Sequence, residues 1–239
     1  MGKFKYSEEE FLGSILKNEY LFPITSSKNN LMNKQLDFRV LMLMTLLSNR
    51  QTMNDFEERG ENELWRYLYR NKLKEYQNLV ESLSKTKLNT IYKNIKRMEK
   101  LDCKVIDIVK TEGNDIVYYI KYTDNNREFV MIETKIMEAL IHSFNSNAIK
   151  VYIVLKYMCR NGKKKISQEW LLKQIGLNVN SHNNNRLITN ITTELHCGGY
   201  INKYTETIDG NKKINYYEVN SLNEWEHIRK TEREFNSHV

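Results

Sequence analysis

The sequence lacks most of the residue patterns that build catalytic, metal or disulfide sites. Its three cysteines are an odd number without a CxxC spacing, which argues against a disulfide framework and a zinc site. The five histidines form neither a His-x-His pair nor an HExxH motif, and no GxxxxGK(S/T) or GxGxxG loop occurs. These absences argue against metal-dependent tyrosine nickases, zinc hydrolases and enzymes with such nucleotide-binding loops. We therefore expect no enzymatic activity, no metal site and no cofactor.

Long apolar runs are also absent. No run reaches the ~18 residues that a membrane span requires. The N-terminus, where Glu8, Glu9 and Glu10 follow a basic start, has no apolar segment of the kind found in signal peptides. An odd number of cysteines also fits a reducing compartment. From these features we expect a soluble cytoplasmic protein that does not bind membranes.

Positive charge is present in moderate excess. The 239 residues include 37 Lys and Arg against 30 Asp and Glu, which gives a formal net charge of +7. This balance favours an anionic partner, but it is spread through the chain, so it does not by itself distinguish a nucleic-acid-binding protein from an ordinary basic one. A chain of this length suits two domains of about 100 residues each.

One pattern occurs twice along the chain, the second time roughly 100 residues later. The matching segments are Phe38–Leu47 with Ile149–Met158, Ile91–Ile95 with Leu187–Ile191, and Ile116–Tyr119 with Ile214–Tyr217. Each copy has an apolar helix, two shorter helices and two strands joined by a Gly-containing turn, which is the order of a winged helix. The expected fold class is therefore α+β, mostly α with small β-hairpins, in two tandem winged-helix (helix-turn-helix) domains.

Periodicity and turn residues set the expected elements. In the first copy they are helices at about 36–49, Tyr76–Ser84 and Leu88–Leu101, and strands Lys104–Lys110 and Ile116–Lys121 around the turn Glu112–Asp115. In the second copy they are helices Ala148–Arg160, Ser167–Ile175 and His182–Leu195, and strands Tyr200–Thr207 and Lys213–Val219 around Asp209–Asn211. A helix over Glu133–Phe144 connects the copies.

These elements define the expected domains. They are an N-terminal extension (1–30), a first winged-helix domain (31–125), a connecting strand and helix (126–146), a second winged-helix domain (147–220) and a C-terminal helix (221–239). Ser221 and Glu224 have capping-box spacing at the start of that helix. Residues 51–75 find no counterpart in the second copy and are interpreted as an insertion. The acidic and aromatic residues of this insertion suit either a contact with another protein or a solvated helix that packs its aromatics on its own domain.

The third helix of the first copy concentrates positive charge. Residues 85–100 include six basic residues and one acidic residue. At 100° per residue, Leu88, Ile91, Ile95 and Met98 fall on one face, which we expect to be buried. The opposite side, on which Thr86 also falls, is the face that a winged helix presents to DNA. The candidate DNA-binding residues here are Lys85, Lys87, Asn89, Thr90, Lys93, Lys96, Arg97 and Lys100.

The third helix of the second copy has a less charged outward face. Its inward residues are Leu187, Ile188, Ile191 and Leu195, and its candidate DNA-binding residues are His182, Asn185, Arg186, Thr189, Asn190 and Thr193. Asn pairs bidentately with adenine and Arg with guanine, whereas Lys mostly neutralises phosphate. We therefore expect the second domain to read more sequence and the first to supply more salt-dependent affinity. Flanking backbone contacts are expected from Lys163, Lys164, Lys165, Lys212 and Lys213.

With these domains placed, residues 29–219 resemble the theta-type plasmid replication initiators that bind iterons. The likeness rests on Asn29–Met32 followed by Phe38–Leu47, on Phe129–Ile132 followed by Ile136–Leu140, and on Ala148–Leu155. The resemblance implies tandem winged helices that bind direct repeats as monomers and repress their own promoter as dimers. It also implies melting of origin DNA and recruitment of host replication proteins without catalytic residues. The second domain is also similar to the N-terminal domain of phage replisome organisers.

Three functions remain open from the sequence. The leading hypothesis is a sequence-specific double-stranded DNA-binding protein that initiates plasmid or phage replication at repeated origin sites. The alternative is a winged-helix transcriptional regulator, which needs the same DNA-binding face. A further alternative is a pair of protein-interaction winged helices that do not bind DNA.

Overall fold

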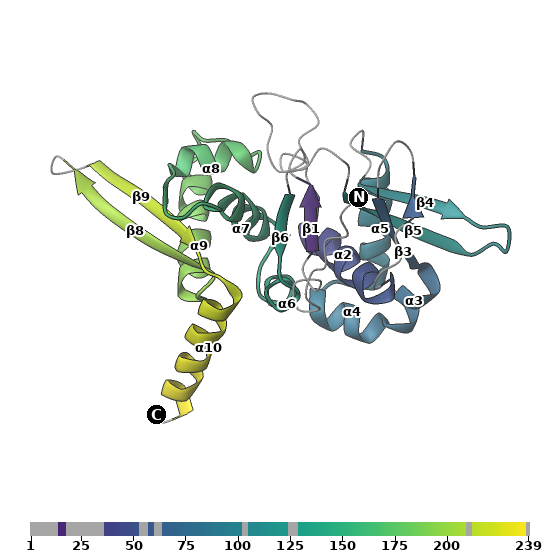
Figure 1. The fold of residues 1–239 in the computed structure, drawn as a ribbon. Coiled ribbons are helices and arrows are strands. Elements are labelled where there is room, and N and C mark those ends of the chain that lie inside the picture. The colour runs from purple at the N-terminus through teal and green to yellow at the C-terminus, as the bar shows by residue number, and fades with distance from the viewer. Residues whose placement is uncertain are drawn as a thin grey trace, which may run out of the picture. The chain divides into compact units, whose positions relative to one another are not determined.

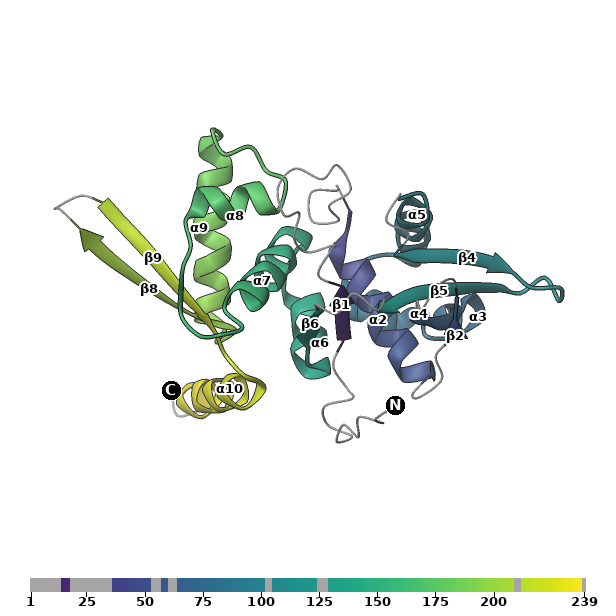
Figure 2. The same cartoon turned by 45° about the horizontal axis from the view of Figure 1, so that its top comes forward.

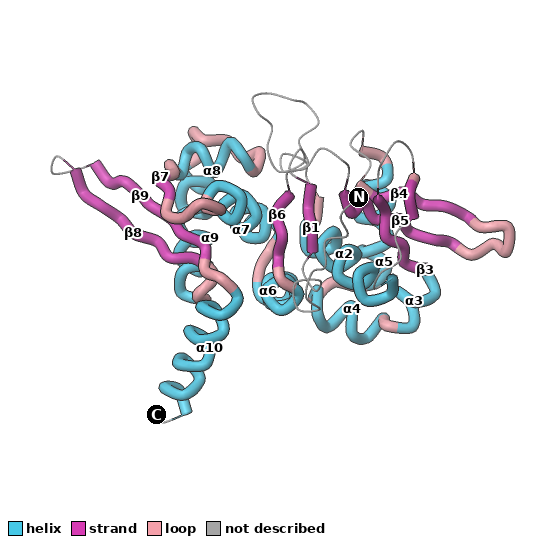
Figure 3. Tube along the Cα trace, viewed as in Figure 1, coloured by secondary structure: helices cyan, strands magenta, loops and turns pink. Residues whose placement is uncertain are grey.

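The computed structural model describes residues 14–17, 36–52, 57–59, 64–101, 105–123, 129–208 and 212–237. These residues divide into two compact units, the first ending at Ser146 and the second starting at Asn147 (Figure 1). Each unit combines helices with a small antiparallel sheet (Figure 3). The expected α+β class is therefore confirmed.

The first unit has a four-stranded sheet and a separate strand pair. Its elements are α2 (Phe38–Thr52), β2 (Glu57–Glu58), β3 (Leu64–Tyr69), α3 (Arg70–Glu75), α4 (Gln77–Ser84), α5 (Leu88–Glu99), β4 (Ile106–Lys110), β5 (Ile116–Thr123), β6 (Phe129–Ile132) and α6 (Thr134–Ser143). The sheet order is β2-β3-β5-β4, and β1 (Ser14–Lys17) pairs with β6. The strand at 14–17 lies in the expected N-terminal extension, where periodicity did not indicate a strand.

Helix α2 forms the core of the first unit. From Phe38 to Leu46 every apolar side chain is at most 2% exposed. A helix that is apolar on all sides has to be buried on all sides, and α2 contacts β3, α4, α5 and α6. Its N-terminus is capped by a residue far along the chain, because Ser146 Oγ accepts from the Phe38 N–H at 2.9 Å and donates to the Leu36 carbonyl at 2.8 Å.

The second unit has a three-stranded sheet of order β7-β9-β8. Its elements are α7 (Ser146–Met158), β7 (Lys164–Lys165), α8 (Gln168–Gln174), α9 (His182–Cys197), β8 (Ile201–Ile208), β9 (Lys212–Val219) and α10 (Leu222–Ser237). Helix α7 supplies the core, with Val151 through Leu155 all fully buried. Just beyond the end of α8, Gly176 has a φ of 75°, the left-handed conformation expected at this helix stop.

The two units have related topologies. The second unit runs helix, strand, helix, helix, strand, strand from α7 to β9, and the first has this order with two additions, the strand β2 before β3 and the helix α3 after it. The three strands common to both sheets have the same order, as β3-β5-β4 and as β7-β9-β8. The β4–β5 hairpin of the first unit and the β8–β9 hairpin of the second each project beyond the helices of their own unit (Figures 1 and 2). Within the segment 51–75, residues 64–69 form the strand β3, which lies beside β5 as β7 lies beside β9, whereas β2 and α3 have no counterpart in the described part of the second unit. The sequence comparison missed this match because a six-residue strand and a two-residue strand share no pattern.

The aromatic residues of β3 pack on their own unit. Trp65 and Leu68 are 4% and 1% exposed. The Tyr67 ring lies 6.3 Å from the Tyr119 ring, and the Arg59 guanidinium lies 4.0 Å from the centroid of that same Tyr119 ring. Tyr69 of the same strand is 41% exposed. Trp65 and Tyr67 thus pack within the unit, and the protein-contact interpretation of this segment stays a prediction.

The remaining elements agree with the expected helices and hairpins to within a few residues. At the first hairpin turn the left-handed residue is Asn114, with a φ of 64°. Several expectations lie outside the described residues: the rest of the N-terminal extension, the acids at 55, 61 and 63, the segment Asn29–Met32 and the turn Asp209–Asn211.

The capping box at the start of α10 is confirmed. The Ser221 N–H donates to the Glu224 carboxylate at 2.6 Å, and the Glu224 N–H donates to Ser221 Oγ at 3.4 Å. One turn later, Trp225 packs its ring 5.6 Å from that of Tyr200. The helix is thereby fixed against the base of the β8–β9 hairpin.

Asn220 joins three segments at this base. Its side chain is buried, donates to the Gly199 carbonyl at 2.8 Å and accepts from Asn202 Nδ2 at 2.8 Å. Its N–H donates to the Tyr200 carbonyl. A buried acceptor that loses its donor loses free energy of solvation without compensation.

We expect Asn220→Ala to lower the free energy of unfolding of the second unit by about 1–3 kcal/mol, because it leaves the Gly199 carbonyl unpaired. Asn223→Ala is the matched control, since Asn223 is exposed on α10 and should change stability by less than about 0.5 kcal/mol. Urea unfolding followed by tryptophan fluorescence measures both. Equal losses in the two variants would contradict the assigned role of Asn220.

Lys150 on α7 makes stability depend on pH. It is 4% exposed, and burial lowers its pKa from 10.5 to about 8. As pH rises above about 8 the folded protein releases this proton while the unfolded chain keeps it, so the free energy of unfolding should increase. We expect Lys150→Met to abolish this rise between about pH 7 and 8.5. Above this range the buried Cys159, whose pKa is raised by burial from 9.0 to about 11, contributes with the opposite sign. Lys173→Met, at an exposed position, should retain the rise; urea midpoints across the pH range provide the test.

Candidate nucleic-acid interface

The exposed face of α5 is held in place by Glu81 of α4. The Glu81 carboxylate accepts from the Leu88 N–H at 2.9 Å, which caps α5, and from Lys87 Nζ at 3.2 Å. These bonds, the Leu88 N–H first, keep the pKa of Glu81 below its usual value. Between the helices, Lys85 adopts a left-handed conformation with a φ of 51°. The turn from α4 into α5 is thus fixed at both of its ends.

The two faces of α5 separate as the periodicity predicts. Leu88, Ile91, Ile95 and Met98 are buried, and Asn94 is buried beside them. All the candidate DNA-binding residues of the first unit are exposed: Lys85, Lys87, Asn89, Thr90, Lys93, Lys96, Arg97 and Lys100. Thr86 is a correction, because it is 9% exposed and donates to the Ser84 carbonyl instead of facing solvent.

The positive charge on α5 is largely uncompensated. Among the described residues, no carboxylate forms an ion pair with Lys93, Lys96, Arg97 or Lys100. Of the cations on this face, Lys87 alone has an acidic partner among the described residues, Glu81, at 3.2 Å. Four cations on consecutive turns of one exposed face repel one another, so an anion bound across this face would be favourable.

Helix α9 places its candidate residues on a similar face. Ser181 caps it by accepting from the Asn184 N–H at 3.4 Å. Ile188, Ile191, Thr192 and Leu195 are buried, while Leu187, expected inward, is half-buried. Of the candidates, Asn185 is half-buried and the others are exposed: His182, Arg186, Thr189, Asn190 and Thr193.

Three of these side chains already have partners in the second unit. Asn185 Nδ2 donates to the Val179 carbonyl at 3.2 Å, and Thr189 Oγ1 accepts from Gln168 Nε2 at 2.9 Å. Thr193 accepts from Lys203 Nζ at 3.4 Å. These bonds hold α9 to its neighbours, so the residues act mainly in positioning the helix.

Arg186 and Asn190 remain the best placed to contact a ligand. Both are exposed, and within the described part of the chain neither makes a side-chain hydrogen bond or ion pair. They are four residues apart and therefore adjacent on one helix face. His182 is exposed in the same way at the first turn of α9.

The flanking lysines of the second unit differ in their surroundings. Lys164 and Lys165 form the exposed edge strand β7, and Lys213 is exposed on β9. Lys163 Nζ instead lies 4.3 Å from the Tyr204 ring and 4.8 Å from the Tyr216 ring, so it binds to the hairpin itself. Lys212 begins β9, and its side chain lies outside the described residues.

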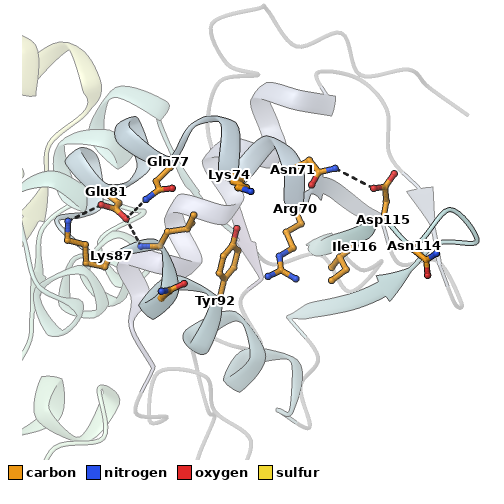
Figure 4. A pocket seen from close by; sticks show the side chains of 12 residues that line it. Arg70, Asn71, Lys74, Gln77, Glu81, Lys87, Tyr92, Asn114, Asp115 and Ile116 are labelled. Carbon is orange, nitrogen blue, oxygen red and sulfur yellow. Dashed lines mark hydrogen bonds and ion pairs between the residues drawn. The ribbon is translucent and has the colours of Figure 1, made fainter.

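Charge counting along α5 missed a hollow beside that helix. It has a volume of about 730 Å³, and Figure 4 shows most of its lining side chains. The lining comes from four elements and the hairpin turn: Arg70, Asn71, Lys74, Gln77, Glu81, Lys87, Leu88, Asn89, Tyr92, Asn114, Asp115 and Ile116. The sequence signal was the pair Arg70 and Lys74, which fall on one side of α3 at helical spacing.

Other kinds of site are not evident in the described residues. No group of three or more His, Cys, Asp or Glu there is arranged to hold a metal ion, and none of the described helices has the length and apolar character to cross a membrane. No protein-family model, curated protein or solved structure matches the chain.

Proposed function

We propose that both units are winged helices and that the protein binds double-stranded DNA through α5 and α9. The topology supports the first part: the second unit runs helix, strand, helix, helix and a two-stranded hairpin, and the first unit runs the same way with the extra strand β2 and the extra helix α3. In such folds the third helix enters the major groove and the hairpin contacts the backbone.

The observation that carries the proposal is the unpaired positive charge of α5. Lys93, Lys96, Arg97 and Lys100 are exposed and have no acidic partner among the described residues. A duplex carries one negative charge per about 1.7 Å of axis, and cations that neutralise it release counterions. The α5 face suits this sequence-independent attraction.

Helix α9 is proposed to supply base recognition. The Arg186 guanidinium can bind guanine at O6 and N7, and the Asn190 amide can bind adenine at N6 and N7. Neither side chain has to break a contact within the described part of the unit first.

The biological role we propose is initiation of plasmid or phage replication at repeated origin sites, acting with host replication proteins and with a homodimer as the repressing form. The resemblance to iteron-binding initiators supports this role. A winged-helix transcriptional regulator is the alternative, and a protein-interaction module the further one. Binding of the purified protein to random and upstream genomic DNA across a salt series tests the first step. Affinity that falls steeply with salt supports DNA binding, whereas no duplex binding at low salt leaves only the protein-interaction module.

We expect the double variant Lys93→Gln/Arg97→Gln to flatten the salt dependence of DNA binding. Each lost phosphate contact lowers the slope of log K against log salt by about 0.9, so two give about 1.8. Lys135→Gln/Lys230→Gln is the control, because it removes the same charge from exposed positions on α6 and α10. Equal slopes for both variants would show that net charge alone, and not the α5 face, governs binding.

The selected DNA is the upstream genomic fragment that binds most tightly. We expect Asn190→Ala and Arg186→Ala each to reduce the preference for this DNA over random DNA by about 1–3 kcal/mol. For Asn190→Ala the salt slope should not change. Asn223→Ala, exposed on α10, is the control. Competition binding measures the ratio of the affinities for selected and random DNA. If the variants lose the same affinity for random DNA as for selected DNA, these side chains do not recognise bases.

A further inference from the structure

The hollow of the first unit has an arrangement of charge that suits a bound anion. Figure 4 shows Arg70, Lys74 and Tyr92 between Glu81 at one end and Asp115 at the other. The volume of about 730 Å³ falls within the range of small-ligand sites, about 300–1,000 Å³. It is therefore large enough for a phosphate together with the sugar that carries it.

The two central cations are available. The Arg70 guanidinium lies 4.7 Å from the centroid of the Tyr92 ring, and this stacking restricts its orientation. Lys74 is one turn further along α3 and exposed. In the described part of the chain neither of them pairs with a carboxylate, whereas Lys72 on the same helix pairs with Glu75 at 2.7 Å.

The two acids of the lining are already engaged. Glu81 accepts from the Leu88 N–H, Lys87 Nζ and Gln77 Nε2. Asp115 accepts from Asn71 Nδ2 at 3.3 Å. Both carboxylates lie at the ends of the hollow and accept hydrogen bonds from protein donors. The centre of the hollow is therefore lined by the two cations.

We propose that this hollow binds one sugar–phosphate unit, with the phosphate on Arg70 and Lys74. The planar Arg fork matches two phosphate oxygens and the Lys ammonium supplies a point charge. Neutral donors come from Gln77 and Asn89, and α4 begins at Gln77 without a side-chain cap, which leaves a helix N-terminus favourable for an anion.

The phosphate is assigned to the DNA backbone, and this assignment rests on the proposed function. Asn89 lines the hollow and is also exposed in the first turn of α5. A strand whose bases face α5 would therefore pass its backbone over the hollow. In the second unit no helix separates β7 from α8, and Gln168 of α8 binds Thr189 of α9 directly. The site is thus a feature of the first unit among the described residues.

The test uses the full chain with Arg70→Gln/Lys74→Gln, and with Lys74→Gln alone. Loss of two phosphate contacts should lower the salt slope by about 1.8, and loss of one by about 0.9, without changing the preference for selected over random DNA. Lys72→Gln/Lys135→Gln is the matched control, because Lys72 is on α3 but does not line the hollow. It should leave the slope unchanged, and circular dichroism checks that every variant folds.

The outcomes separate this inference from the proposed function. If Lys93→Gln/Arg97→Gln flattens the slope and neither hollow variant does, the hollow inference is wrong and DNA binding by α5 stands. If the wild-type protein binds no duplex, the proposed function fails. Titration with deoxyadenosine monophosphate and with inorganic phosphate then shows whether the hollow binds a phosphate group. Nucleotide binding that Arg70→Gln/Lys74→Gln abolishes would assign the site to free nucleotides; binding of neither probe overturns it.

Discussion

Burial of the first helix on all sides is the constraint on which each unit depends. In the first unit, every residue of α2 from Val40 to Ser48 is buried, so β3, α4, α5 and α6 have to cover it. Each covering element packs its apolar face on α2, so its polar face is left towards solvent. The polar face of α5 is therefore exposed because Ile91, Ile95 and Met98 are needed in the core. The second unit has the same requirement in α7.

Folding explains the inward face of α5 but not its outward face. Like charges at helical spacing destabilise a helix by about 0.2–0.5 kcal/mol per pair, and Lys93 with Arg97 and Lys96 with Lys100 are such pairs. A solvated face with mixed signs would be more stable. On the neighbouring helix α3, the stacked Arg70 and Lys74, which has no acidic partner in the described part of the chain, add to the same imbalance. Lys96 and Arg97 also lie in the last turn of α5, where positive charge interacts favourably with the helix dipole. An anion across these residues would offset their mutual repulsion, which is the physical basis of the DNA proposal.

Local periodicity was sufficient for the helices and hairpins, whereas contacts between distant residues were not predictable from it. β3 was missed because its strand character depends on pairing with β5, about fifty residues later. Thr86 was misplaced because helical angles do not apply in the turn before α5. Asn185 and Thr189 were predicted from the outward direction alone, although their partners Val179 and Gln168 occupy their side chains. The hollow requires α3, α4, α5 and a hairpin turn together, which no sequence window contains.

The difference between the two units also bears on the role. A palindrome is matched by two identical readers related by two-fold symmetry. In the proposed function, one chain carries two DNA-binding units of related topology but different chemistry. The first has cations on α5 without acidic partners among the described residues, and the second has Arg186 and Asn190 on α9. If each reader contacts its own part of the DNA, a single chain matches a site without internal symmetry. Several chains then bind copies of that site in the same orientation, so the asymmetry favours an initiator at direct repeats over a regulator at a palindrome.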